Sequence, residues 1–253
     1  MNHQLPAGVQ AEAVRLYDQG LSITAAAARL QISRTGCYNA LCRHTHLRSP
    51  GPARSCRVDA DFFSRLDDEL PAYWLGFLTA DGHVSDKAVQ LQLSTRDAEH
   101  VRNFATDLDS TYAVRTQGRM TTTAIYSPAL VKSLRQLGLS RRKSHTVKPA
   151  AIPDSAMRHY WRGLVDGDGC IRVDRRSGFI VDLCGSRFIV DGFRRFVYAV
   201  LGKEQRIHPH GSIYAIRYHG AFALELAAYL YVAVSRALSR KRAVIEREVC
   251  YAG

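Results

Sequence analysis

The sequence has no apolar run approaching eighteen residues, and its first residues show no signal-peptide pattern. A membrane-spanning helix needs about 20 apolar residues, so no membrane partner is expected. The six cysteines form no C-x-x-C pair, which disfavours both a zinc knuckle and a disulfide framework. We therefore expect a cytoplasmic protein with reduced thiols.

Acidic residues and lysine are both scarce. Asp and Glu number 23 against 35 basic residues, which gives a net charge of +12, and only six of the basic residues are Lys. A chain this basic is typical of proteins that bind nucleic acid or an anionic membrane. Arg forms bidentate contacts with phosphate and guanine, so the composition favours nucleic acid, and association with the nucleoid when the protein is bound to DNA.

Residues 1–46 predict a small all-α domain of three short helices, with Ser22 and Ser33 as N-caps of the second and third. The segment 16–41, LYDQGLSITAAAARLQISRTGCYNAL, resembles the helix-turn-helix of site-specific recombinases and transposases. The resemblance implies that the third helix enters the major groove of DNA. Its DNA-binding residues would be Arg34, Thr35, Tyr38, Asn39 and Arg43. A helical hairpin with no DNA role remains an alternative. Residues 47–64, basic and without a hydrophobic period, predict a linker.

The rest of the chain contains a repeat. Residues 73–82 read YWLGFLTADG and residues 160–169 read YWRGLVDGDG, 87 positions later. This spacing suits a duplicated subdomain, so we expect one subdomain over 65–150 and a second over 151–253. Each reads as helix, hairpin, helix, hairpin, helix. The strict alternation of residues 89–94, VQLQLS, illustrates the half-buried strands.

The repeated helix carries small residues four positions apart, Gly76 with Ala80 and Gly163 with Gly167. Residues with this spacing share a helix face, and small ones allow two backbones to approach closely. We therefore expect the two repeated helices to meet along this face.

Each repeated helix ends on an aspartate, Asp81 or Asp168, and Gly82 and Gly169 are predicted to adopt the left-handed conformation after it. Two carboxylates at adjacent helix ends repel each other and raise one pKa, unless a cation lies between them. A divalent ion held by carboxylate and carbonyl oxygens relieves the repulsion and suits phosphodiester cleavage. A single Asp-Gly could simply end a helix, but its repetition disfavours that interpretation.

These residues resemble the LAGLIDADG homing endonucleases in their single-chain, two-motif form. The resemblance implies an α+β fold of two pseudo-symmetric αββαββα subdomains that form a DNA-binding saddle. It also implies metal binding by Asp81, Asp168 and the carbonyls of Gly82 and Gly169, with Mg²⁺ as cofactor and Mn²⁺ or Ca²⁺ able to substitute in binding. A basic residue late in each repeat supports catalysis in relatives, and Lys143 and Lys241 match it here. The family's usual acidic sixth position is Asp166 in copy two but Thr79 in copy one.

Alternation along the strands predicts which side chains face DNA. Gln and Arg are the side chains that read adenine and guanine edges. The expected contacts are Gln90, Gln92, Arg115, Gln117, Arg119, Thr121 and Thr123 in copy one, and Arg172, Arg175, Arg176, Arg206, His208 and Arg217 in copy two.

The sequence thus predicts a site-specific, metal-dependent endonuclease that cuts double-stranded DNA at a long asymmetric target, as a monomer acting as a pseudo-dimer. Two alternatives on the same fold stay open. One is a transcriptional regulator that binds DNA without cleaving it, and the other is a maturase that binds intron RNA.

Overall fold

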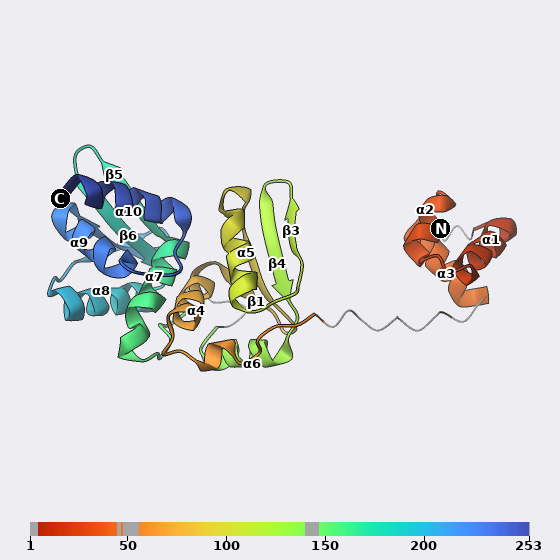
Figure 1. Cartoon of the computed structure of the whole chain (residues 1–253), viewed down its shortest axis with the longest axis horizontal. Helices are drawn as coiled ribbons and strands as arrows, with labels where there is room; N and C mark the ends of the chain where they lie inside the picture. Colours follow the sequence, from red (N-terminus) through yellow and green to blue (C-terminus); the bar gives the residue numbers. More distant parts are fainter. Residues whose placement is uncertain (1–4, 45–46, 48–55, 140–146, 253) are drawn as a thin grey trace. The chain divides into compact units, whose positions relative to one another are not determined.

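The computed structural model describes residues 5–44, 47, 56–139 and 147–252 (Figure 1). The chain divides into two compact units, Met1–Ser55 and Cys56–Gly253. Within the described ranges, no helix combines the length and apolar character needed to cross a membrane.

The smaller unit contains α1 (Ala7–Asp18), α2 (Ile23–Arg29) and α3 (Arg34–His44). Both predicted caps are confirmed. The Ser22 hydroxyl accepts the N–H of Ala25 at 3.1 Å, and the Ser33 hydroxyl accepts the N–H of Gly36 at 3.0 Å. Each cap satisfies an N–H group that a helix start otherwise leaves without a partner. The three helices close on a small core of Ala13, Leu16, Tyr17, Ala26, Ala27, Cys37 and Leu41.

The larger unit contains the duplicated subdomains. The first is built from α4 (Glu69–Asp81), β1 (Gly82–Val84), β2 (Val89–Ser94), α5 (Ala98–Asp107), β3 (Val114–Gln117), β4 (Met120–Ile125) and α6 (Pro128–Gln136). The second is built from α7 (Met157–Asp168), β5 (Gly169–Asp174), β6 (Gly178–Gly185), α8 (Arg187–Leu201), β7 (Ile207–His210), β8 (Ile213–His219), α9 (Gly220–Tyr231) and α10 (Ser239–Ala252). Short 3₁₀ turns lie before α4 (η1, Phe62–Ser64), between β2 and α5 (η2, Thr95–Asp97) and before α7 (η3, Asp154–Ala156).

The two sheets share one topology. Their strand orders are β1-β2-β4-β3 and β5-β6-β8-β7, with every pairing antiparallel. The registers also match, because Gly82 pairs with Leu91 in the first sheet and Gly169 pairs with Leu183 in the second. The predicted α+β fold of two αββαββα copies is therefore confirmed, with α10 following the second copy.

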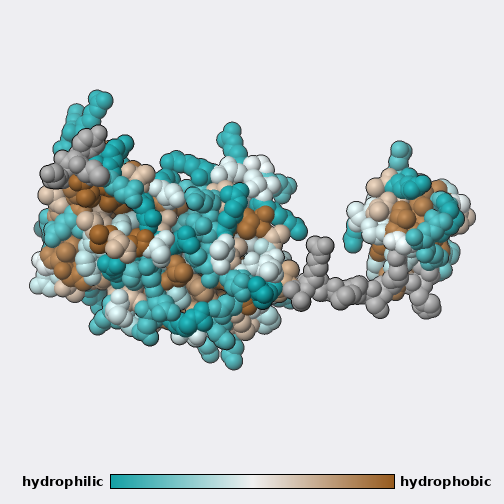
Figure 2. Space-filling model, viewed as in Figure 1, coloured by the Kyte–Doolittle hydropathy of each residue, from teal (hydrophilic) through white to brown (hydrophobic). Residues whose placement is uncertain are grey.

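Each sheet buries one face under helices. In β2 the predicted alternation holds, since Val89, Leu91 and Leu93 are buried while Gln92 on the opposite face is exposed. Helix α5 packs on the first sheet, and α8 and α9 pack on the second. The buried side chains of both copies form one continuous core. In Figure 2 the hydrophobic residues in view lie mainly over the second subdomain, around α9 and α10.

Residues 56–64, the last part of the predicted linker, pack with the first subdomain. The N–H of Arg57 donates to the Thr111 hydroxyl at 2.7 Å, and the N–H of Asp59 donates to the Leu108 carbonyl at 2.9 Å. Phe62 and Phe63 are buried in the core. The larger unit therefore begins before the first repeated helix.

Candidate metal and DNA-binding site

Helices α4 and α7 run side by side in the same direction, with their backbones in contact. A Cβ atom added at Gly76 would lie 2.0 Å from the carbonyl oxygen of Tyr160. One added at Gly163 would lie 2.1 Å from the carbonyl oxygen of Tyr73. The predicted contact between the repeated helices is confirmed, and no side chain larger than hydrogen fits at either glycine.

Because the helices are parallel, their C-terminal ends lie together. Asp81 and Asp168 are the last residues of α4 and α7, and both are exposed. A Cβ added at Gly167 would lie 3.5 Å from Asp81 Oδ2, so the Asp81 carboxylate lies against the last turn of α7. Gly167 directly precedes Asp168 in the sequence. The negative ends of two helix dipoles and two carboxylates thus meet in one place, which favours a bound cation.

The glycines after the aspartates do not adopt the predicted conformation. Gly82 has φ −76° and ψ 147°, and Gly169 has φ −91° and ψ 170°, both extended. The left-handed prediction is wrong because each glycine already begins a strand. Close packing requires glycine instead, since a Cβ at Gly82 would lie 2.7 Å from the Leu78 carbonyl oxygen, and one at Gly169 would lie 2.5 Å from that of Val165. Each aspartate therefore lies at the junction of its helix and its sheet.

Lys241 on α10 supplies a fixed cation at the end of α7. Its Nζ donates to the carbonyl oxygens of Val165, Asp166 and Gly169 at 2.6, 2.7 and 2.6 Å. Burial lowers the pKa of Lys241, and the nearby Asp166 opposes that effect. The ammonium thus binds three carbonyl groups at the point where α7 passes into β5. Lys143, the other lysine predicted to be catalytic, falls in the segment 140–146, outside the described residues.

The donor set at the two helix ends fits Mg²⁺. Within the described ranges, no group of three or more His, Cys, Asp or Glu side chains could hold a metal. Mg²⁺ is commonly held by one or two carboxylates, with water and substrate phosphate completing the shell. Asp81 and Asp168 match that pattern. The Gly169 carbonyl already accepts the Lys241 ammonium, so the two carboxylates are the principal candidate ligands.

The sixth motif position differs between the copies in its bonding as well as its charge. The Asp166 carboxylate is buried and accepts the Tyr73 hydroxyl at 2.7 Å, the Tyr231 hydroxyl at 2.6 Å and the N–H of Leu238 at 2.8 Å. Thr79, at the matching position, donates to the carbonyl of Leu75 in its own helix at 2.7 Å. Asp166 therefore joins α7 to α4 across the seam and also to α9 and the start of α10. Thr79 bonds within its own helix and contacts the Tyr160 hydroxyl across the seam, so it links fewer elements.

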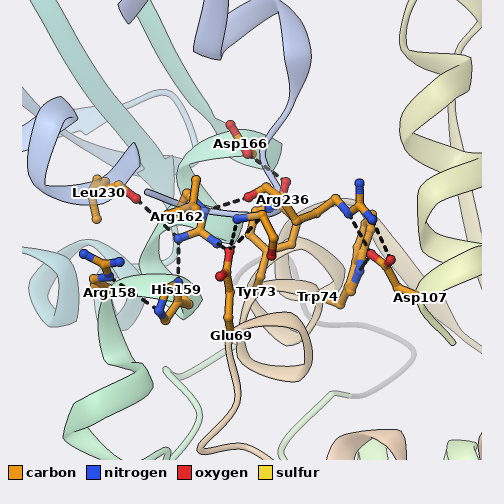
Figure 3. Close-up of polar contacts among 12 residues, drawn as sticks. Glu69, Tyr73, Trp74, Asp107, Arg158, His159, Arg162, Asp166, Leu230 and Arg236 are labelled. Atoms are coloured by element: carbon orange, nitrogen blue, oxygen red, sulfur yellow. Dashed lines mark hydrogen bonds and ion pairs between the residues drawn. The ribbon is translucent and has the colours of Figure 1, made fainter. Parts of the chain in front are cut away.

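A buried arginine extends this network to the first subdomain (Figure 3). Arg162 is fully buried on α7, and its Nη2 forms an ion pair with Glu69 at 2.8 Å. Its Nε donates to the carbonyl of Arg236 at 2.9 Å, and Arg236 binds Asp107 through two bonds of 2.7 and 2.6 Å. None of these residues was predicted from the sequence. The available signal was a charged residue, Arg162, where the first copy has Leu75.

The outer face of the first sheet carries most of its predicted contacts. A groove of about 600 Å³ is lined by side chains that include Gln92, Arg115, Gln117 and Thr122. Gln90 shares this face by register, and Arg119 is exposed in the β3–β4 turn.

Two residues predicted for this face lie on the other side of the sheet. Thr121 and Thr123 are buried at 0% and 1% exposure, so their outward placement is wrong. Residues 121–123 are three consecutive threonines, and such a run shows no alternation from which a face could be assigned. The pairing with β2 decides it, because Thr122 lies opposite Gln92 and accepts its side-chain amide at 2.9 Å.

The second sheet presents a more basic face. The registers put Arg172, His208 and Arg217 on the face opposite the core, as predicted. Arg175 and Arg176 are exposed in the β5–β6 turn, and Arg206, just before β7, is also exposed. Asp182 lies among these arginines and was not predicted from the sequence.

In the smaller unit, the five residues predicted to bind DNA are all on α3. Arg34, Thr35, Tyr38, Asn39 and Arg43 are exposed, while Cys37, Ala40 and Leu41 pack inward. The helix thus presents one polar, basic face to solvent.

Comparisons with known proteins bear on the fold. No protein-family model matches the sequence, and no curated protein matches it. Among solved structures, the LAGLIDADG meganuclease I-AabMI, bound to uncleaved DNA, has a TM-score of 0.50 at 11% identity, covering 72% of this chain and 89% of its own. The LAGLIDADG homing endonuclease I-GzeII, in complex with its DNA target, has a TM-score of 0.48 at 11% identity, covering 72% and 91%.

Full-length DUF199/WhiA from Thermatoga maritima has a TM-score of 0.47 at 15% identity, covering 75% of this chain and 66% of its own. The paired four-stranded sheets, the parallel α4–α7 seam and the likeness to I-AabMI agree with one another. The larger unit has the two-subdomain LAGLIDADG fold.

Proposed function

We propose that this protein is a site-specific endonuclease that hydrolyses both strands of double-stranded DNA at a long asymmetric target, with a divalent metal as cofactor. The observation that carries the proposal is the junction of α4 and α7, where Asp81 lies against the last turn of α7 beside Asp168. DNA binding alone needs no carboxylates, which repel phosphate. The meganuclease I-AabMI, whose structure shows uncleaved DNA, has the same fold.

The residues at this junction have separate roles. Asp81 and Asp168, with the carbonyls of Gly82 and Gly169, would hold the metal at the point where helix passes into sheet. The metal, which we take to be Mg²⁺, would polarise the scissile phosphate and lower the pKa of a bound water. Lys241 holds the α7 end in place through three carbonyls, and so positions Asp168 and Gly169. Lys143 remains a candidate for polarising water or the phosphate in the first copy.

The two sheets would bind the two halves of the target, since each has one buried face and one polar outer face. One chain contains both copies, so a monomer suffices. The helix-turn-helix adds a second DNA-binding surface through α3. If Arg34 contacts a phosphate, replacing it with Gln should weaken DNA binding and reduce the slope of affinity against salt concentration by about one phosphate contact. If Arg34 instead contacts a base, the same change should relax sequence specificity at the base pair that it reads.

The test of cleavage begins with selection of a target from random duplex DNA, followed by incubation of that target with protein and Mg²⁺. We expect double-strand cleavage that EDTA abolishes. Asp81→Asn and Asp168→Asn should bind the target with unchanged affinity in Ca²⁺ and fail to cut it. Asp67→Asn, an exposed aspartate before α4, serves as the matched control and should cut normally.

Cleavage by both site variants at the wild-type rate would refute the metal site. Specific binding without nicking by the wild-type protein would instead favour a regulator that does not cut DNA. Preferential binding of intron RNA over duplex DNA would favour a maturase.

A further inference from the structure

The outer face of the second sheet contains a buried carboxylate between two exposed arginines. The Asp182 side chain is 9% exposed, and its Oδ2 lies 3.1 Å from both Arg172 Nη1 and Arg217 Nη2. Arg217 Nε also donates to this oxygen at 3.1 Å. The two arginine side chains are 39% and 49% exposed. One acidic group thus fixes two guanidinium groups that remain open to solvent.

This cluster lies next to the proposed metal site. Asp182 pairs in register with Cys170, the second residue of β5, and β5 begins directly after Asp168. The thiol of Cys184, two residues further along β6, has a pKa raised by burial, by Asp182 and by Asp168. Both carboxylates therefore lie near the same thiol, so the arginine pair is close to the point where DNA would be cut.

The matching position in the first sheet has different chemistry. Register equates Asp182 with Gln90, because Gln90 pairs with His83 and Ala124 just as Asp182 pairs with Cys170 and Arg217. The neighbouring Gln92 binds the Thr122 hydroxyl. The first sheet thus has Gln90 and Ala124 where the second has Asp182 and Arg217, so it has no carboxylate-held arginine at this position.

Fixing an arginine changes what it can recognise. Asp182 binds the Nε and Nη2 donors of Arg217 and leaves the Nη1 donors on the other side of the planar group. An arginine held in place loses less side-chain entropy when it binds, and arginine donors match O6 and N7 of guanine. Glutamine matches adenine in the same way. The single negative charge also leaves the pair with a net positive charge, which DNA attracts.

We propose that Asp182 is a positioning residue that holds Arg172 and Arg217 for guanine recognition. As a result, the half-site under the second subdomain requires guanine near the cleavage point, and the half-site under the first does not. The inference rests on the proposed DNA-binding function and adds the residue that makes the two halves of the target chemically unequal.

Selection from random duplex DNA by the full-length protein, in Ca²⁺ to prevent cleavage, tests the inference. The wild-type profile should contain one or two guanines required near the centre of one half-site only. Asp182→Asn has the same size without the charge, and it should lower that preference about tenfold while leaving other positions unchanged. Arg217→Gln should change the preference at one of these base pairs from guanine to adenine. Gln90→Asn, the matched control, should alter only the opposite half-site.

Each contrary outcome is distinct. If Asp182→Asn weakens binding to all sequences equally, the arginines contact phosphate and the inference fails. If both variants keep the wild-type profile, the inference fails while the proposed function stands. If the wild-type protein selects no DNA sequence, both fail together. Thermal melting of each variant confirms folding, and Arg217→Gln, at an exposed side chain, still tests the inference if Asp182→Asn unfolds.

Discussion

Lys241 on α10 binds the C-terminal end of α7, and Asp166 on α7 binds the N-terminal end of α10. The Lys241 ammonium donates to the main-chain carbonyl of Asp166 near the end of α7, at 2.7 Å. The Asp166 carboxylate accepts the N–H of Leu238 at the start of α10, at 2.8 Å. A cation thus lies at a helix C-terminus and an anion at a helix N-terminus, both favourable arrangements. This pair of contacts holds α10 against the end of the second metal-binding helix.

Lys241→Met should destabilise the larger unit. The change removes a buried ammonium and leaves the carbonyls of Val165, Asp166 and Gly169 without their shared donor. We expect the free energy of unfolding to fall by about 3 kcal/mol, measured by urea denaturation. Lys132→Met, at an exposed lysine on α6, should change it by less than about 0.5 kcal/mol. Equal stability of the two variants would show that the ammonium has no structural role.

Asp166→Asn should cost more stability than Thr79→Val at the matching position. The first change removes the charge that accepts two tyrosine hydroxyls and one N–H, whereas the second removes one bond within α4 and a contact with the Tyr160 hydroxyl. We expect losses of about 3 and about 1 kcal/mol, respectively. Combining Asp166→Asn with Tyr231→Phe should lower the free energy of unfolding by less than the sum of the single changes, because both changes affect the same hydrogen bond between residues 166 and 231. Full additivity, or equal losses at the two positions, would contradict the asymmetry.

Gly163→Ala should separate the two repeated helices. The new Cβ would lie 2.1 Å from the Tyr73 carbonyl oxygen and 2.7 Å from the Phe77 nitrogen, both of them backbone atoms that cannot rotate away. We expect a loss of about 3 kcal/mol, which lowers the melting temperature of a unit this size by roughly 6–12 °C. Gly8→Ala in α1, where a Cβ meets nothing within 4 Å, should leave that transition unchanged. An unaltered melting temperature in Gly163→Ala would refute the close packing.

Stability should fall as the pH drops below about 6.5, in part because of His100. This side chain is 3% exposed and hydrogen-bonds the Tyr73 hydroxyl at 3.0 Å, and burial lowers its pKa from 6.5 to about 4. Above pH 6.5 the ring is neutral whether the chain is folded or not. Between pH 6.5 and 4 only the unfolded chain takes up the proton, so the free energy of unfolding falls by about 3 kcal/mol. Below pH 4 both states bind the proton, and the fall levels off.

Denaturation measured from pH 7.5 to 4 tests this dependence. His100→Phe should reduce its slope, leaving the share contributed by His159, whose pKa is also lowered to about 4, chiefly by burial. His210→Gln, at an exposed position, should not change the slope. An unchanged slope in His100→Phe would contradict the assignment.

Features set by repetition and local pattern were predictable from the sequence. The glycine seam follows from Gly76 and Gly163 in matching places, and strand β2 follows from alternating Val, Gln and Leu. The face predicted for Thr121 and Thr123 is wrong, because three identical residues show no period from which to choose one. The conformations of Gly82 and Gly169 depend on contacts with the turn before them. The Arg162–Glu69 pair joins residues 93 positions apart, and no local pattern records such a distance.

The close contact of α4 with α7 also bears on how the chain folds during its synthesis. At a synthesis rate of 5–20 residues per second, the ribosome needs roughly 4–17 seconds to proceed from Asp81 to Asp168. Throughout that time the glycine face of α4 has no partner helix, and Tyr73 lacks the carboxylate to which it will donate. The first subdomain therefore emerges with the glycine face of α4 uncovered, and this face is a binding surface for a chaperone that recognises nascent chains.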